Sequence, residues 1–192
     1  FFIKHYNKNK RDISGSSTRQ TTDFIKVKKI LNFLIKKKIS ICIVGNRNDI
    51  GNKYLKSLIK NYNKKKIFFL YNLNSQMNLS EQLYIFNKSL GFIGNGCGII
   101  EYFYFLRKKT LIFDFMNSGY VNKFEYIADK KKYNFKYLYK SYYKNGKRLS
   151  ILKAAKELNK LSLSNKKYIP KNHFIKENTF VDIKKEITKI FC

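Results

Sequence analysis

Residues 39–45 read ISICIVG, a mostly apolar and β-branched run that ends in glycine. A run of this kind is typical of a strand buried on both faces, as strands are in a parallel sheet. The residues before it, about 24–37, place their apolar side chains mostly on one face of a helix, with Thr22 or Asp23 as its N-cap. The polar loop NRNDIGN follows the glycine. The stretch therefore predicts a helix–strand unit of a parallel α/β sheet.

The same alternation extends to both sides of residues 39–45. Further strands are predicted at FFIKHY (1–6), KIFFLYNL (66–73), LGFIGN (90–95) and TLIFDF (110–115). Further helices are predicted at KYLKSLIKNY (53–62), NLSEQLYIFNKS (78–89) and GIIEYFYFLRK (98–108). Because short loops join alternating elements, the pattern predicts an α/β fold with a doubly wound parallel sheet, Rossmann-like, with helices on both faces. We expect the strands that end near Tyr6, Gly45, Tyr71 and Gly94 to share one carboxyl edge.

The pattern loosens after Phe115. Residues 117–148 are tyrosine-rich and partly irregular, and helices are predicted at LSILKAAKELNKL (149–161) and NTFVDIKKEITKIF (178–191), the second with Asn178 or Thr179 as its cap. We therefore expect a single domain over residues 1–192 with a C-terminal helical extension from about 145 to 192. The first residues already have the pattern of a strand, so we expect an N-terminal domain to precede them in a longer protein.

The chain has 192 residues, of which 44% are hydrophobic and 17% aromatic, so it can form a packed core. Its formal charge of +29 would attract nucleic acid, anionic lipid or phosphorylated ligands. The lysines do not gather in one tail, because KKK recurs at 36–38, 64–66 and 130–132 between apolar segments. Lys, Asn, Ile, Phe and Tyr all have A/T-rich codons, so the base composition of the gene accounts for much of the charge.

The cysteines and histidines do not form a metal-binding pattern. Cys42, Cys97 and Cys192 include no CxxC pair, which fits a reducing compartment. His5 and His173 are isolated, and His173 is expected at the surface because no partner is evident. No 18-residue apolar run encodes a membrane span.

Residues 91–98, GFIGNGCG, hold four glycines between a predicted strand and a predicted helix. Glycine lets the backbone approach a ligand closely, and a helix that begins there aims N–H groups at an anion. The spacing is not the dinucleotide fingerprint G-x-G-x-x-G, because Glu101 stands where the last glycine would be, and no lysine follows as in a P-loop. A ligand cradle and a purely structural turn both remain open at this point.

Several stretches in this order resemble a family of bacterial glycosyltransferases linked to surface-polysaccharide synthesis, and more loosely the donor-binding half of the GT-B superfamily. The stretches are STRQTTDFIKVKKILNFLIKKKISICIVGNRN, SEQLYIFNKSLGFIGNGCGIIEYFYFLRKKTLIFDF, YKNGKRLSILKAAKEL and FIKENTFVDIKKEITKIF. The likeness runs over nearly the whole chain. It implies a GT-B C-terminal-type domain that binds a nucleotide-sugar donor. A proline usual near residues 110–115 is absent here.

The resemblance also implies a set of substrate-binding residues at the carboxyl ends of the strands. The glycine turn would take the donor's diphosphate or ribose, Arg19 and Arg47 would contact the anion, and Glu101 would bind sugar hydroxyls. The alternatives are solvated arginines and a helix-capping carboxylate, and His5 is either a base, a phosphate contact or structural. The candidate set is His5, Arg19, Gly45, Asn46, Arg47, Asn95, Gly96, Cys97, Gly98 and Glu101. The sequence shows no catalytic base.

The expected partners are a nucleotide-sugar donor and a glycan or polysaccharide acceptor, with no metal and no further cofactor. We expect the protein to lie in the cytoplasm, with its lysines in peripheral contact with the anionic inner face of the membrane. One alternative is a basic nucleic-acid-binding protein, in which Tyr137, Tyr139, Tyr142 and Tyr143 would stack on bases. No known nucleic-acid-binding motif supports it. Another alternative is a non-catalytic relic of the Rossmann-like fold.

Overall fold

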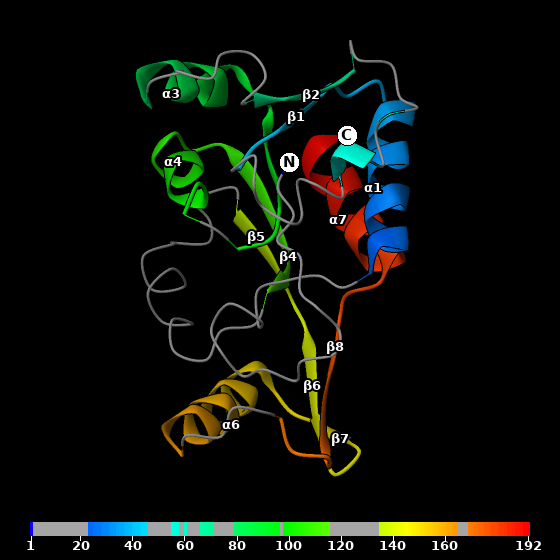
Figure 1. Ribbon diagram of the computed structural model, residues 1–192, viewed down its shortest axis with the longest axis vertical. Helices are drawn as coiled ribbons and strands as arrows, with labels where there is room; N and C mark the ends of the chain where they lie inside the picture. The colour runs from blue at the N-terminus through cyan, green and yellow to red at the C-terminus, as the bar shows by residue number, and fades with distance from the viewer. Residues whose placement is uncertain are drawn as a thin grey trace.

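The structure is a computed structural model that describes residues 1, 23–45, 55–57, 60, 66–70, 79–96, 98–115, 135–164 and 169–192. Figure 1 shows an α/β body above and a smaller unit of strands and one helix below, joined by two continuous strand-forming segments. The strand at 1–6 lies outside the described residues except for Phe1, and the helix at 53–62 is described only at 55–57 and 60. Within these ranges no helix is long and apolar enough to cross a membrane.

The body is built on parallel strands, as the sequence predicts. Strand β1 (Ile41–Ile43) pairs in parallel with β2 (Ile67–Phe69), and β3 (Gly91–Gly94), β4 (Lys109–Phe115) and β5 (Phe135–Tyr139) form a second parallel sheet in the order β3-β4-β5. Phe1 lies beside β1, because its nitrogen donates to the Cys42 carbonyl at 2.7 Å and its carbonyl accepts from the Val44 N–H at 3.1 Å. The strand pairing described in the body is therefore parallel.

Both faces of these strands are buried, which explains their apolar runs. One face packs against α1 (Phe24–Lys36) and α7 (Phe180–Phe191), and the other against α3 (Leu79–Lys88) and α4 (Ile100–Phe105). Successive residues alternate between the two cores: Ile93 and Leu111 face α1 and α7, whereas Phe92 and Ile112 face α3 and α4. Figure 1 shows the two pairs of helices on opposite sides of the strands. The prediction of an α/β fold with helices on both faces of parallel strands is confirmed. The described strands pair as a two-stranded and a three-stranded sheet, so one sheet with a shared carboxyl edge for the strands ending near Tyr6, Gly45, Tyr71 and Gly94 stays a prediction.

The lower unit differs from the predicted helical extension. Its antiparallel sheet has the order β7-β6-β8, with β6 (Ser141–Lys144), β7 (Lys147–Arg148) and β8 (His173–Lys176). Both predicted helices are present. The first is α6 (Ile151–Leu163), which packs on β6 in the lower unit, and the second is α7, which belongs to the body. Residues 135–140, FKYLYK, place an aromatic residue at every second position, which is the pattern of a half-buried strand.

The prediction that His173 lies at the surface is wrong. Only 6% of His173 is exposed, and its Nδ1 lies 2.7 Å from the hydroxyl of Tyr142, which is itself buried. Burial, helped by the nearby charge of Glu157, raises the pKa of Tyr142 to about 12. The partner of the histidine is 31 positions away in the chain, on the antiparallel neighbour of its own strand, so the sequence around His173 did not show it.

Helix α7 begins with a capping box. The hydroxyl of Thr179 accepts from the Asp182 N–H, and the Asp182 carboxylate accepts from the Thr179 N–H at 3.1 Å. The Thr179 hydroxyl also donates to Asp182 Oδ2 at 2.6 Å, and this bond, together with the bond from the Thr179 N–H, lowers the pKa of Asp182. Thr179 is therefore the cap of α7, as one of the two candidates predicted from the sequence. Asp23, one of the two candidates for α1, caps that helix by accepting from the Lys26 N–H at 3.0 Å.

We expect Thr179→Ala to lower the free energy of unfolding by about 1 kcal/mol, because the N–H groups of the first turn lose their acceptor. Thr179→Ser keeps the hydroxyl and should stay close to the wild type in urea denaturation. A group whose pKa is lowered by folding stabilises the fold above its ordinary pKa, and this contribution is lost as the pH falls through the lowered value. The difference in the free energy of unfolding between Thr179→Ala and the wild type should therefore become smaller at low pH. A difference that does not change with pH would contradict the role of the Asp182 carboxylate.

Candidate functional site

Strands β3, β4 and β5 are parallel neighbours, so their carboxyl ends meet at one edge of the sheet. This edge is the usual place for ligands in open α/β sheets. Asn95 follows β3, Asp114 lies near the end of β4, and Lys140 follows β5. All three of these polar residues are buried.

A row of hydrogen bonds links these strand ends across the edge. The Asn95 side-chain amide donates to the Phe113 carbonyl at 3.1 Å. The neighbouring Asp114 and Asn178 bind each other twice: the Asn178 N–H donates to Asp114 Oδ1 at 2.7 Å, and the Asp114 N–H donates to Asn178 Oδ1 at 2.8 Å. Asn178 also donates to the Tyr139 carbonyl at 2.9 Å. The row therefore runs from the glycine turn to the end of β5, and it ties both to the residues that precede α7.

A bulge in β4 directs Asp114 toward helix α1. The pairing of β4 with β5 shifts register between Ile112 and Phe115, and Asp114 has a φ of +52°. Strict alternation would place Asp114 on the α3–α4 face with Ile112, whereas it contacts Lys26 of α1 on the opposite face. A bulge turns a side chain away from the alternating pattern in this manner, and aspartate adopts positive φ more readily than most residues.

The bulge brings together two lysines and two carboxylates. Lys26 Nζ donates to Asp114 Oδ2 at 2.5 Å, to Glu177 Oε2 at 2.9 Å and to the Asn178 carbonyl at 3.0 Å. Lys140 Nζ lies 3.7 Å from Glu177 Oε1. The side chains of Lys26 and Asp114 are 2% and 0% exposed, so this is an interior network rather than a surface ion pair. We call Lys26, Asp114, Lys140 and Glu177 the charge network.

The electrostatics of the charge network follow from its burial. Burial raises the pKa of Asp114, and the neighbouring Lys26 opposes this shift. Burial lowers the pKa of Lys140, and Glu177 opposes that shift. The three contacts of Lys26 match the three N–H donors of an ammonium group, so this lysine holds α1, β4 and the start of α7 together.

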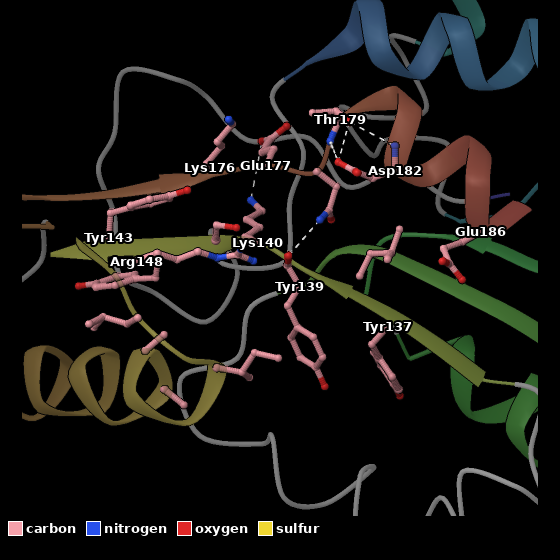
Figure 2. Close-up of a pocket in the computed structure, with 18 of the residues that line it drawn as sticks. Tyr137, Tyr139, Lys140, Tyr143, Arg148, Lys176, Glu177, Thr179, Asp182 and Glu186 are labelled. Carbon is pink, nitrogen blue, oxygen red and sulfur yellow. Dashed lines mark hydrogen bonds and ion pairs between the residues drawn. The ribbon is translucent and has the colours of Figure 1, made fainter. Parts of the chain in front are cut away.

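A cavity of about 530 Å³ lies beside the charge network, between β5, the antiparallel sheet and the first turns of α6 and α7. Figure 2 shows Lys140 and Glu177 above the tyrosines of β5, with Arg148 extending from β7 toward Lys140. The lining combines tyrosines, basic residues and acidic residues. They include Tyr137, Tyr139, Lys140, Tyr143, Arg148, Lys176, Glu177, Thr179, Asp182, Lys185 and Glu186. We call this the inter-sheet cavity.

The structure places half of the candidate residues predicted from sequence. Gly45 ends the β1 segment with a φ of +119°, a conformation that favours glycine. Asn95 and Gly96 are buried, whereas Gly98 and Glu101 are exposed at the start of α4. A Cβ added at Gly98 meets no atom of the described residues within 4 Å, so the turn is open on that side. His5, Arg19, Asn46, Arg47 and Cys97 lie outside the described residues.

The contacts of Asn95 and the position of Glu101 bear on their alternative structural roles. The Asn95 amide binds the β4 backbone, so a packing role for Asn95 is shown. The N-cap position of α4 is Ile99, which makes no side-chain cap bond, and Glu101 lies in the first turn. The described lining of the inter-sheet cavity includes neither residue.

Sequence reasoning missed the charge network, although a signal was present. Lys26 stands on the helix face that also carries Val27, Ile30 and Leu34, and Asp114 interrupts the apolar run TLIFDF. A lysine on an apolar helix face and a carboxylate within an apolar strand are costly unless they are paired. Taken together they indicate a buried ion pair between the helix and the strand.

Among the described residues, no group of three or more His, Cys, Asp and Glu side chains is placed to hold a metal ion. The candidate site consists of three neighbouring parts: the carboxyl edge of β3–β5, the charge network and the inter-sheet cavity. A scan against protein-family models, a search of curated proteins and a search of solved structures found no match.

Proposed function

We propose that this chain is the nucleotide-sugar-binding half of a glycosyltransferase that extends a surface polysaccharide or another glycan. The observation that carries the proposal is the carboxyl edge of the parallel strands β3–β5, where buried polar groups and an open glycine turn lie together. Open α/β sheets bind nucleotides at this edge. The proposed reaction, glycosyl transfer, comes from the resemblance of the sequence to polysaccharide glycosyltransferases. The same resemblance is the basis for proposing a GT-B C-terminal-type domain.

Under this proposal the donor lies across the edge of the sheet. The open turn at Gly98 takes the ribose or the diphosphate, and the exposed carboxylate of Glu101 accepts hydrogen bonds from sugar hydroxyls. Arg19 and Arg47 contact the anion, because guanidinium groups grip phosphate oxygens with two donors. Positive charge stabilises the diphosphate as it leaves. The catalytic base comes from a second domain, and the protein acts at the cytoplasmic face of the membrane.

The tyrosines weigh against the nucleic-acid alternative. Tyr142 is buried and bound to His173, and the ring of Tyr143 stacks on Phe174 with centroids 4.3 Å apart. Tyr137 and Tyr139 pack against Phe115. Tyr142 is therefore not accessible to a base, and the partly exposed rings of Tyr137, Tyr139 and Tyr143 already pack against neighbouring rings, which leaves less of their surface for stacking on bases.

The proposal is tested by titrating uridine, guanosine and adenosine diphosphates, and a random oligonucleotide, at low and moderate salt. We expect one diphosphate to bind best and to keep its affinity at moderate salt. Binding through general phosphate neutralisation would instead weaken steeply with salt. Tight oligonucleotide binding without any preference among the nucleotides would overturn the proposal.

The same titration uses Gly98→Val to test the turn. Because a Cβ at Gly98 meets open space, the variant should keep the thermal midpoint of the wild type while its affinity for the preferred nucleotide falls at least tenfold. Val181→Ala alters an exposed side chain on α7, away from the turn, and serves as the control. Normal nucleotide binding by a stable Gly98→Val variant would show that the turn is only structural.

A further inference from the structure

The inter-sheet cavity has the size of a ligand site. Its volume of about 530 Å³ falls within the roughly 300–1,000 Å³ of small-molecule sites. It opens beside the carboxyl end of β5, where the hydrogen-bonded row from the glycine turn ends at Tyr139. Its walls come from two sheets and two helices, so the fold builds it from segments far apart in the sequence (Figure 2).

The acidic residues of the cavity are already engaged within the protein. Glu177 pairs with Lys26 and Lys140, Asp182 accepts from Thr179, and Glu186 lies 3.3 Å from Lys189 Nζ. The lysine partners offset the charges of Glu177 and Glu186, whereas the bonds to Thr179 stabilise the Asp182 carboxylate in its charged form.

Three basic residues of the cavity differ in this respect, whereas Lys140 already pairs with Glu177. In the part of the chain that the structure describes, the ion pairs do not include Arg148, Lys176 or Lys185. Arg148 is exposed on the short strand β7 and reaches toward the buried Lys140 (Figure 2). The lining therefore presents a surplus of positive charge to a ligand, and a guanidinium beside an ammonium favours an anion with several oxygens.

We infer that the inter-sheet cavity binds the phosphoryl groups of a phosphorylated ligand, with Arg148 and Lys140 as the anion contacts. The inference rests on the proposed function, because it assigns the donor's diphosphate to this cavity and leaves the ribose to the glycine turn. The two places lie at the ends of β3 and β5, two strand spacings or about 10 Å apart, which a nucleoside diphosphate can span. Tyr139, the last residue of β5, also lines the cavity and flanks the bound group.

The test is a calorimetric titration of inorganic pyrophosphate into the wild type and into Arg148→Gln at 0.15 M salt. We expect Arg148→Gln to bind pyrophosphate about tenfold more weakly, because a charge-assisted contact is lost. Lys28→Gln removes the same charge from an exposed position on α1, outside the cavity, and should change the affinity less than twofold. Lys140→Met should weaken binding as well, and its thermal midpoint shows whether it remains folded.

The outcomes separate this inference from the proposed function. Equal weakening in Arg148→Gln and Lys28→Gln, or no binding of pyrophosphate by the wild type, would overturn the cavity assignment. If the wild type prefers one nucleoside diphosphate but Arg148→Gln binds it normally, the proposed function stands and the cavity assignment fails. If Arg148→Gln loses pyrophosphate while the wild type shows no nucleotide preference, the cavity is a phosphate site and the proposed function fails.

Discussion

Lys26→Met is expected to lower the free energy of unfolding by about 3–5 kcal/mol, the usual cost of removing one partner from a buried ion pair. Lys26 supplies the Asp114 and Glu177 carboxylates with their closest cation, and Asp114 is wholly buried. Without the lysine, Asp114 would keep its hydrogen bonds with Asn178 and, among the described residues, the electrostatic attraction of the more distant Lys140. Since a domain has about 5–15 kcal/mol of stability in total, urea denaturation should show a large shift of the midpoint.

Lys189→Met provides the matched control for this experiment. Lys189 also pairs with a glutamate, Glu186, but its side chain is 58% exposed and water screens the interaction. Its loss should change the free energy of unfolding by less than about 1 kcal/mol. Equal effects of the two substitutions would show that burial of the charge network does not determine its strength.

The double variant Lys26→Met/Asp114→Asn tests the reason for the loss. Asparagine tolerates the positive φ at this position and still accepts from the Asn178 N–H, but it carries no charge. If the cost of Lys26→Met comes from an uncompensated carboxylate, the double variant should be less destabilised than the sum of the two single variants. Additive losses would attribute the effect to packing of the lysine stem instead.

The parts of the fold that local patterns determine were predictable from the sequence. ISICIVG is apolar at both odd and even positions because β1 is buried on two faces, and such a run predicts a parallel sheet. The caps Asp23 and Thr179 follow from the chemistry of the first helical turn, in which a side-chain oxygen accepts from a free N–H. These features depend on residues within a few positions of one another.

The charge network and the inter-sheet cavity depend on long-range pairing, which single-sequence patterns do not contain. Lys26 and Glu177 are 151 positions apart, and they meet only because α1 and the start of α7 lie side by side at the end of β4. The direction of Asp114 depends on a bulge whose position comes from the register of β4 against β5. The tyrosine-rich strands were not predicted, because residues 117–148 as a whole are irregular and the alternation of aromatic residues is confined to a few positions from 135 to 140.

Gly91→Ala is expected to destabilise the domain by about 3 kcal/mol, at the upper end of what an added methyl group costs in a closely packed interior. A Cβ at Gly91 would lie 2.0 Å from the Lys109 carbonyl oxygen and 2.9 Å from Phe191 Cε1. Gly91 pairs directly with Lys109 in the parallel ladder, so the methyl group would push β3 away from β4. Relief is difficult because the nearest atom belongs to the backbone of a paired strand rather than to the tip of a flexible side chain.

Gly98→Ala is the matched control, since it adds the same methyl group to the same glycine-rich segment. A Cβ there meets no atom within 4 Å, so urea denaturation should place this variant within about 0.5 kcal/mol of the wild type. A Gly91→Ala variant that unfolds at the same urea concentration as Gly98→Ala would contradict the close approach of β3 to β4. The comparison also bears on the site, because β3 carries the glycine turn and Asn95 bonds to β4. If β3 is displaced, the turn moves with it. We therefore expect substitution of Gly91 to lower stability, and substitution of Gly98 to lower ligand affinity while stability is kept.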